Sequence, residues 1–259
     1  MAASTPERGT KQQIESAAIV LDCRDHGESD KIVTFFCQDI GRITGIAKGA
    51  KRSKKRFVNK LEIFSSLRIL HTLPQNGRLA FIAEAELVDG FLSLRTDISC
   101  YTSASIIREL VLLATKDLEG DEKLFPLLHW VLHSLNCARS QYPVLIFFLI
   151  RFFAIIGYSP NLTNCHDCGC ELVQNKLFSF HLQSGGILCS HCNKDKQSTR
   201  IRLSCGTLRS LDMALKQPLN RIQRLQFTEQ SRREALSFFH LYARQLFQRE
   251  IVSWQFLDV

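Results

Sequence analysis

Four cysteines of this chain form two closely spaced pairs, Cys165 with Cys168 and Cys189 with Cys192, and twenty residues separate the pairs. The C-x-x-C spacing places two thiolates on one side of a tight turn, and two such turns complete a tetrahedron of sulfur around a zinc ion. Four thiolates leave no coordination position for water. The spacing therefore predicts a structural rather than a catalytic Zn²⁺ site.

Three further side chains near these pairs are able to bind a metal, namely Cys170, His166 and His191. Any of them is an alternative to one of the four cysteines, and the sequence does not decide between them. A thioredoxin-like redox motif is the poorer interpretation, because no βαβ pattern surrounds either pair. A bound zinc ion would order the polar segment 161–196, which has few apolar residues of its own.

A second feature with chemical meaning is the positive charge between residues 48 and 60. This segment holds seven lysines and arginines and no acidic residue, within a chain that has 33 Lys+Arg, 25 Asp+Glu and a net charge of +8. Without these seven, the remaining 26 basic and 25 acidic residues give a net charge of only +1. Such a dense run predicts a polyanion site, for which nucleic acid is the commonest ligand. A solvated charged loop or a localisation signal is the alternative.

The basic segment lies within a region whose pattern predicts β-strands. Apolar and β-branched runs at 17–23, 31–37 and 42–47 precede it, and alternating apolar and polar residues at 61–69 and 79–87 follow it. Five short strands with a longer insertion between the third and the fourth match an OB-fold barrel. An SH3-like barrel has a similar number of strands, and composition alone does not separate the two.

From residue 97 the apolar period becomes helical, with stripes that begin near residues 106, 124, 208 and 235. The run 142–156 is apolar on nearly every side, which predicts a helix at the centre of a bundle. It is too short for a membrane span and has an arginine in its middle.

These patterns together predict an α+β fold. We expect a disordered lead-in at 1–13, a five-stranded OB-fold barrel at 14–92, and an α-helical domain at 93–259 with a four-cysteine zinc-binding insertion at 161–196. The hydrophobic fraction of 45% and charged fraction of 22% are typical of a globular protein. The ten cysteines occur without a secretory signal, so a cytoplasmic protein is expected rather than a disulfide framework.

Several short motifs, in this order and spacing, make the chain resemble the RecO family of bacterial recombination mediators. They are AIVL at 18–21, GESD at 27–30, GR at 41–42, AKGAKR at 47–52, FAIIGYSP at 153–160, NL at 161–162 and C-x-x-CG at 165–169. Two departures stand out. Members of the family usually begin close to the first strand, whereas this chain has a polar lead-in before it. Zinc cysteines are not universal in the family, so the metal prediction rests on the spacing in this chain.

The resemblance implies recombinational DNA repair in the RecFOR pathway. Members of the family bind single- and double-stranded DNA, anneal complementary strands, and act with RecR and the acidic tail of SSB to help load RecA onto coated DNA. The resemblance also implies no catalytic activity, and the chain has neither a phosphate-binding G-x-x-x-x-G-K-[ST] loop nor a G-x-S-x-G elbow. The expected location is the bacterial cytoplasm, at the nucleoid.

The candidate DNA-binding side chains are the cations of the basic segment and one arginine on the preceding strand, with Lys31 as a further contributor. Phe35, Phe36 and Phe57 are candidates for stacking on bases, as in many OB-folds, although Phe35 and Phe36 are neighbours on a strand and one of them should belong to the core. The arginines of the last sixty residues form a second, diffuse basic surface that is equally consistent with solvated helices. The primary set is Arg42, Lys48, Lys51, Arg52, Lys54, Lys55, Arg56 and Lys60.

Two other classes of protein share these features. One is a zinc-ribbon nucleic-acid-binding protein of transcription or translation, which a preference for structured RNA would favour. The other is a zinc-dependent nuclease, which metal-dependent cleavage of DNA would favour.

Overall fold

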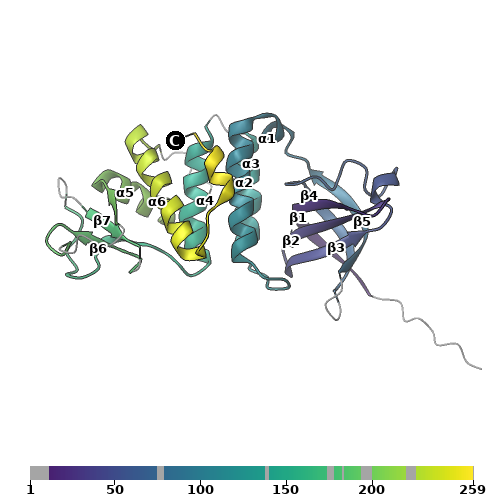
Figure 1. Ribbon diagram of the computed structural model, residues 1–259, viewed down its shortest axis with the longest axis horizontal. Coiled ribbons are helices and arrows are strands. Elements are labelled where there is room, and N and C mark those ends of the chain that lie inside the picture. Colours follow the sequence, from purple (N-terminus) through teal and green to yellow (C-terminus); the bar gives the residue numbers. More distant parts are fainter. Residues whose placement is uncertain are drawn as a thin grey trace, which may run out of the picture. The chain divides into compact units, whose positions relative to one another are not determined.

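The computed structural model describes residues 12–74, 79–137, 140–173, 178–182, 184–193, 200–219 and 226–258 of the 259-residue chain. The chain divides into two compact units, one of residues 1–90 with 116–125 and the other of residues 91–115 with 126–259 (Figure 1). The lead-in predicted at 1–13 lies almost wholly outside the described residues, and Gln13 already belongs to the first strand.

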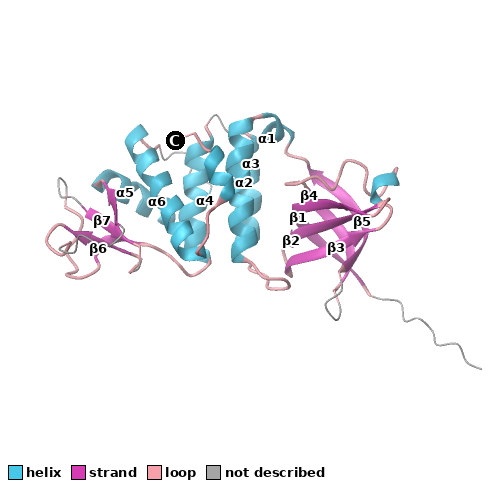
Figure 2. Cartoon of the chain, in the orientation of Figure 1, coloured by secondary structure: helices cyan, strands magenta, loops and turns pink. Residues whose placement is uncertain are grey.

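The first unit contains a closed five-stranded barrel, which confirms the predicted OB-fold and its long insertion between the third and fourth strands (Figure 2). The strands follow the order β1-β2-β3-β5-β4 around the barrel. β3 and β5 pair in parallel, and the other neighbours pair antiparallel. The bounds are Gln13–His26 (β1), Asp30–Cys37 (β2), Gly41–Ala47 (β3), Ser66–Thr72 (β4) and Ala80–Asp89 (β5).

The insertion between β3 and β4 is packed onto the barrel rather than free in solvent. Ala50, Phe57 and Leu61 are buried together with the inward residues of the strands in one apolar core. The strand predicted to begin at residue 61 begins at Ser66, because residues 61–65 form turns that bury Leu61 and Phe64 against the barrel. The apolar residues before Ser66 therefore mark burial against the barrel and not the beginning of the strand.

Residues 116–125 belong to the barrel unit although they are distant from it in sequence. The Leu118 N–H donates to the Arg42 carbonyl oxygen at 2.9 Å, and the Arg42 guanidinium pairs with Asp117 at 2.6 Å. Gly41 has φ +71°, and a Cβ there would lie 2.1 Å from the Glu119 carbonyl oxygen. Only glycine allows this close approach, which gives the Gly41–Arg42 pair of the sequence motif its structural reason.

The second unit contains a helical bundle built around α4, in which eight residues from Leu145 to Phe153 are buried. α4 packs against α2, α5 and α6, so the prediction of a central apolar helix is confirmed. Within the described residues, no helix is long and apolar enough to cross a membrane. The helices are Leu92–Thr96 (α1), Ile98–Ala114 (α2), Leu124–Asn136 (α3), Gln141–Ile155 (α4), Cys205–Lys216 (α5) and Glu229–Phe247 (α6), and a 3₁₀ helix at Val252–Phe256 (η3) follows.

A second, four-stranded sheet lies between α4 and α5 in the chain, and the sequence pattern did not predict it. Phe180 in this sheet contacts Phe238 and Tyr242 of α6 at ring distances of 4.6 and 5.5 Å. The segment thus packs its apolar residues against α6, contrary to the expectation that zinc alone orders it. The strands are Asn161–Cys165 (β6), Phe178–His181 (β7), Gly186–Cys189 (β8) and Arg200–Leu203 (β9), in the order β6-β8-β7-β9.

Candidate metal centre and nucleic-acid interface

The four predicted metal ligands lie together in the second unit. The sulfur atoms of Cys165, Cys168, Cys189 and Cys192 are all within 4.8 Å of one another. Cys168 Sγ lies 3.8 Å from Cys189 Sγ, and a tetrahedron with Zn–S distances of about 2.3 Å has edges of about 3.8 Å. The cluster therefore fits a tetrahedral, thiolate-bound metal ion.

The sheet positions these cysteines at the ends of neighbouring strands. Cys165 ends β6 and Cys189 ends β8, and β6 and β8 pair in parallel, so both strands deliver a cysteine to the same edge. A turn follows each of them, closed by hydrogen bonds from Gly169 N–H to the Cys165 carbonyl and from Asn193 N–H to the Cys189 carbonyl. These turns return Cys168 and Cys192 to the same point.

Backbone N–H groups favour the thiolate form of two of these cysteines. Hydrogen bonds from the Cys192 and His191 N–H groups lower the pKa of the Cys189 thiol to about 6, against the effect of its burial. Burial raises the pKa of Cys165, but hydrogen bonds from the N–H groups of Cys168, Cys189 and Asp167 outweigh it and leave the pKa below its usual value. Thiolates are the form that binds metals, so the backbone prepares the site for a cation.

Cys170 lies beside this cluster without belonging to it. Its thiol is within hydrogen-bonding reach of Cys168 and Cys189, which raises the pKa of Cys170 to about 12. Of the residues that the structure describes, only the four cysteines form a group able to hold a metal ion, so neither His166 nor His191 takes part.

The basic segment of the first unit is attached to the hairpin that connects β1 and β2. The Gly49 N–H donates to Asp30 Oδ1 at 2.8 Å, and the Lys51 N–H donates to the Ser29 carbonyl at 2.9 Å. The hydrogen bond from Gly49 is the main reason that the pKa of Asp30 is lowered. The GESD and AKGAKR motifs thus contact each other directly, which fixes the course of the segment.

The comparisons with known proteins find the same protein family in both units. The family model "Recombination protein O N terminal" matches residues 12–91, and "Recombination protein O C terminal" matches residues 95–255. A DNA repair protein RecO from Syntrophobacter fumaroxidans is 32% identical over 93% of this chain and 95% of that protein. Another, from Desulforamulus reducens, is 30% identical over 93% of this chain and 92% of that protein. The chain belongs to the RecO family.

In this RecO-family chain the cations predicted to bind DNA differ in their contacts, and Lys60 and Arg56 connect the basic segment to β5. Lys60 Nζ donates to the carbonyl oxygens of Lys55 at 2.8 Å, Arg56 at 3.3 Å and Ala85 at 2.8 Å. The Arg56 guanidinium donates to the carbonyls of Ala83 and Lys48, and lies 5.1 Å from the ring centre of Phe57. Both side chains therefore bind the segment to β5.

The other cations of the set range from partly buried to exposed. Arg42 pairs with Asp117, as described above, and Lys51 pairs with Asp25 at 3.0 Å. Arg52 is 74% exposed and lies 3.7 Å from Glu28. The remaining three, Lys48, Lys54 and Lys55, are exposed and have no ion-pair partner in the described part of the chain.

The predicted stacking aromatics are not available to DNA. Phe35 and Phe36 are fully buried and Phe57 is 3% exposed. The expectation that one of Phe35 and Phe36 belongs to the core is confirmed, but the prediction that the other and Phe57 stack on bases is wrong. The barrel unit uses these rings in its packing: Phe36 stacks on Phe125 at 6.3 Å, and Phe57 fixes the basic segment. A sequence shows that aromatic residues are present but does not determine whether they face the core or the solvent of a closed barrel.

The contacts of Lys60 lead to a stability prediction. Lys60→Met should destabilise the protein by about 1–3 kcal/mol, because three carbonyl oxygens lose a charged donor. Urea unfolding followed by far-UV circular dichroism measures the change. The matched control is Lys54→Met, which removes an exposed cation of the same segment and should leave the unfolding free energy within about 0.5 kcal/mol of the wild type. Equal stabilities for the two variants would contradict the anchoring role.

Proposed function

We propose that this chain is a recombinational repair mediator that binds single- and double-stranded DNA and anneals complementary strands. With RecR, it helps load RecA onto SSB-coated single-stranded DNA. The observation that carries the proposal is the exposed cluster Lys48, Arg52, Lys54 and Lys55 on a segment that is fixed to an OB-fold barrel. The barrel domain, 14–92, would bind DNA, and the helical domain, 93–259, would carry the metal site.

Annealing follows from the physical character of this surface. Two complementary strands repel each other through their phosphates, and a fixed row of cations reduces that repulsion by displacing condensed counterions. The strand needs to be held through its backbone, since base edges must remain available for pairing. Lysines on a rigid segment meet this requirement, and the anchoring by Arg56 and Lys60 keeps them in place.

The metal would be zinc in a structural role. Four thiolates close its coordination sphere, and a catalytic zinc site keeps one position for water or substrate. This donor set favours a mediator over a zinc-dependent nuclease, and we assign no catalytic residue. A bound zinc ion would hold the turns after β6 and β8 together. A protein of this kind acts on chromosomal DNA in the bacterial cytoplasm.

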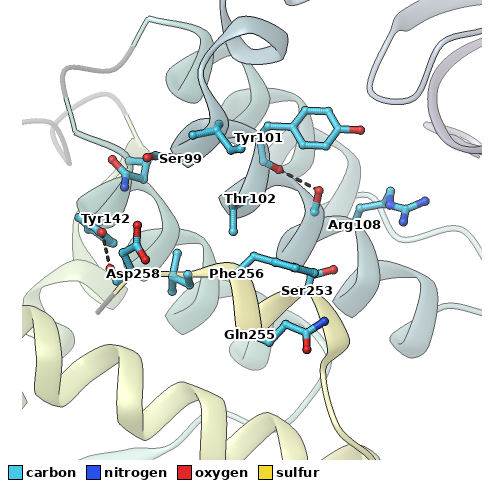
Figure 3. A pocket seen from close by; sticks show the side chains of 13 residues that line it. Ser99, Tyr101, Thr102, Arg108, Tyr142, Ser253, Gln255, Phe256 and Asp258 are labelled. Carbon is cyan, nitrogen blue, oxygen red and sulfur yellow. Dashed lines mark hydrogen bonds between the residues drawn. The ribbon is translucent and has the colours of Figure 1, made fainter.

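SSB is the partner for which the second unit offers a surface. A groove of about 690 Å³ lies between α2, the start of α4 and η3 (Figure 3). Ile98, Tyr101 and Phe256 line it and are 83, 39 and 66% exposed, and Arg108 adds a cation. An acidic tail with apolar side chains would find both apolar contacts and a cation in this groove.

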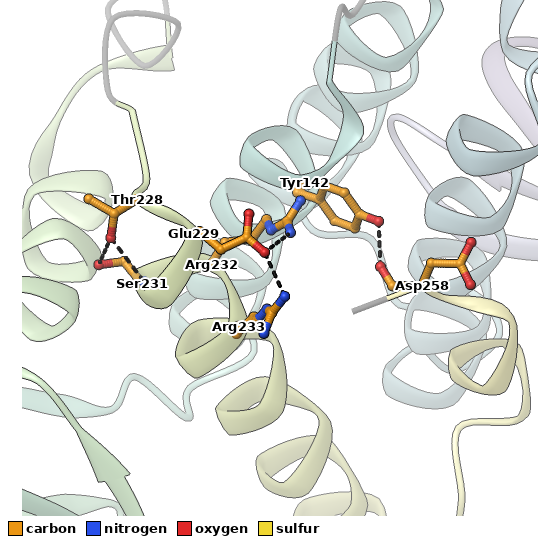
Figure 4. A network of polar contacts seen from close by, with 7 residues as sticks. All are labelled: Tyr142, Thr228, Glu229, Ser231, Arg232, Arg233 and Asp258. Carbon is orange, nitrogen blue, oxygen red and sulfur yellow. Dashed lines mark hydrogen bonds and ion pairs between the residues drawn. The ribbon is translucent and has the colours of Figure 1, made fainter.

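One side of this groove is fixed by a polar network (Figure 4). The Tyr142 hydroxyl donates to the Asp258 carbonyl oxygen, and the Arg232 guanidinium lies 4.3 Å from the Tyr142 ring centre. Glu229 pairs with Arg232 at 3.1 Å and with Arg233 at 2.7 Å. These contacts hold the chain near Asp258 against the helices and keep the groove in shape.

A double variant tests the groove. Ile98→Ser with Phe256→Ser should weaken binding of a peptide of the SSB tail about tenfold or more, because two exposed apolar contacts are lost. Fluorescence anisotropy of a labelled peptide measures the affinity. Val252→Ser changes an apolar residue of η3 that is 57% exposed and does not line the groove, and it should bind as the wild type does. Unchanged binding by the double variant would place the SSB contact elsewhere.

The proposed function as a whole is tested by measuring DNA binding and strand annealing as a function of salt, with and without SSB. Affinity for a single strand should fall with salt at about 0.7 log units per log unit for each neutralised phosphate. Annealing of SSB-coated strands should require the chain. A protein that binds structured RNA in preference to single-stranded DNA would instead favour a role in transcription or translation.

A further inference from the structure

A small polar pocket lies on the barrel beside the basic segment. It has a volume of about 350 Å³ and opens between the segment and the first hairpin, formed by the end of β1 and the start of β2. All of its lining residues belong to the first unit. The proposed function uses the cations of the segment but gives this pocket no role.

The pocket has an apolar floor. Ala50, Phe57 and Leu61 line it, are 7, 3 and 2% exposed, and continue into the core of the barrel. Val58 also lines it and is 45% exposed, so its side chain forms part of the rim. A flat, apolar ring face would find complementary contacts on this floor and rim.

The walls of the pocket carry both hydrogen-bond donors and acceptors. Glu62 and Asn59 have no side-chain partner in the ranges that the structure describes. Ser53 Oγ accepts from the Phe57 N–H at 3.2 Å, which leaves its hydroxyl proton to donate. Asp25 is ion-paired to Lys51, yet its side chain is still 67% exposed. Lys31 completes the wall on the barrel side.

The apolar floor, the carboxylates and the lysines together suit some parts of a nucleotide better than others. Two carboxylates balance the two lysines that line the pocket, so it has no net positive charge with which to attract a phosphate. The same carboxylates accept hydrogen bonds from the N–H groups on the edge of a base, while the neighbouring lysines attract the flanking phosphates. An apolar floor beneath polar walls is a common arrangement for holding a base that has left the stack.

We propose that the pocket receives one unstacked base of a single strand held by the basic segment, with a preference for guanine. This inference rests on the proposed DNA binding and adds a subsite to it. Guanine presents adjacent N–H donors on its pairing edge, which match the carboxylate of Glu62 and the amide of Asn59. Thymine presents only one such donor. The subsite gives a surface that is otherwise indifferent to sequence a local preference.

The test compares the full-length protein on two labelled oligonucleotides, one of thymines only and one with a single central guanine. We expect the guanine-containing strand to bind about fivefold more tightly in fluorescence anisotropy. Inosine, which lacks the 2-amino group, should lose most of this gain. Glu62→Gln and Asn59→Gly should each remove the preference while binding to the thymine strand persists. The glycine suits the Asn59 backbone, which has φ +54°.

The control variant is Glu84→Gln, which changes a barrel carboxylate outside the pocket and should keep the guanine preference. If the wild type binds both strands equally with a normal salt dependence, the pocket proposal fails and the proposed DNA binding stands. A preference that survives in both pocket variants also overturns it. If neither strand binds, the proposed function itself fails.

Discussion

Replacing Cys165 and Cys189 by serine should abolish the proposed metal binding and loosen the second sheet. The two residues are 2 and 5% exposed and end neighbouring strands, so their loss removes half of the proposed ligand set and the link that a metal would make between β6 and β8. Structural zinc ions contribute about 10 kcal/mol or more of binding free energy in small zinc-dependent domains. The aromatic contact with α6 should retain part of the fold, so we expect loosening rather than complete unfolding of the protein.

Two measurements check this prediction. Elemental analysis should find about one metal ion per wild-type chain and none in the double variant. Hydrogen exchange should show lost protection in β6 and β8 and unchanged protection in the barrel. Cys170→Ser is the matched control, because this neighbouring thiol lies outside the four ligands and its variant should keep its metal. A double variant that retains both metal and protection would show that the cluster is not a metal site.

The cysteine cluster shows what local spacing can predict. Each C-x-x-C pair is a turn of four residues, so the sequence identifies the candidate ligands before the fold is known. The sheet that brings the pairs together was missed because its strands are only four or five residues long. Its packing depends on contacts between Phe180 and α6, more than fifty residues further along the chain.

The basic segment shows the opposite limit. Its sequence locates the positive charge but does not separate cations that face solvent from those that hold the segment. Lys60 and Arg56 bind carbonyl oxygens of Ala85 and Ala83 on β5, and Arg42 pairs with Asp117 from another part of the chain. These partners are distant in sequence, and backbone carbonyls carry no side-chain signal. The family resemblance identified the motif, and the contacts distinguish the roles of its members.

The sharpest test of DNA binding changes only the solvent-facing cations of the basic segment and leaves the two that anchor it. Changing Lys48, Arg52, Lys54 and Lys55 together to glutamine should lower the affinity for single-stranded DNA about 100-fold near 0.1 M salt. The salt dependence should fall by about 2 to 3 log units per log unit if each cation neutralises one phosphate. The fold should persist, because Arg56 and Lys60 still bind the segment to β5. Anisotropy titrations at several salt concentrations measure both quantities.

A matched control variant shows whether DNA affinity depends on the position of these cations or only on the net charge of the protein. Changing Arg68, Lys116, Lys216 and Arg233 to glutamine also removes four exposed cations, each of which has an acidic partner in the described structure. Long-range attraction of DNA depends on total charge and should weaken equally in both variants, whereas phosphate contacts depend on where the cations lie. We expect the control to lose no more than about threefold in affinity and to keep the salt dependence of the wild type. Equal losses in the two variants would mean that DNA binds through diffuse charge, and that the basic segment has no special role.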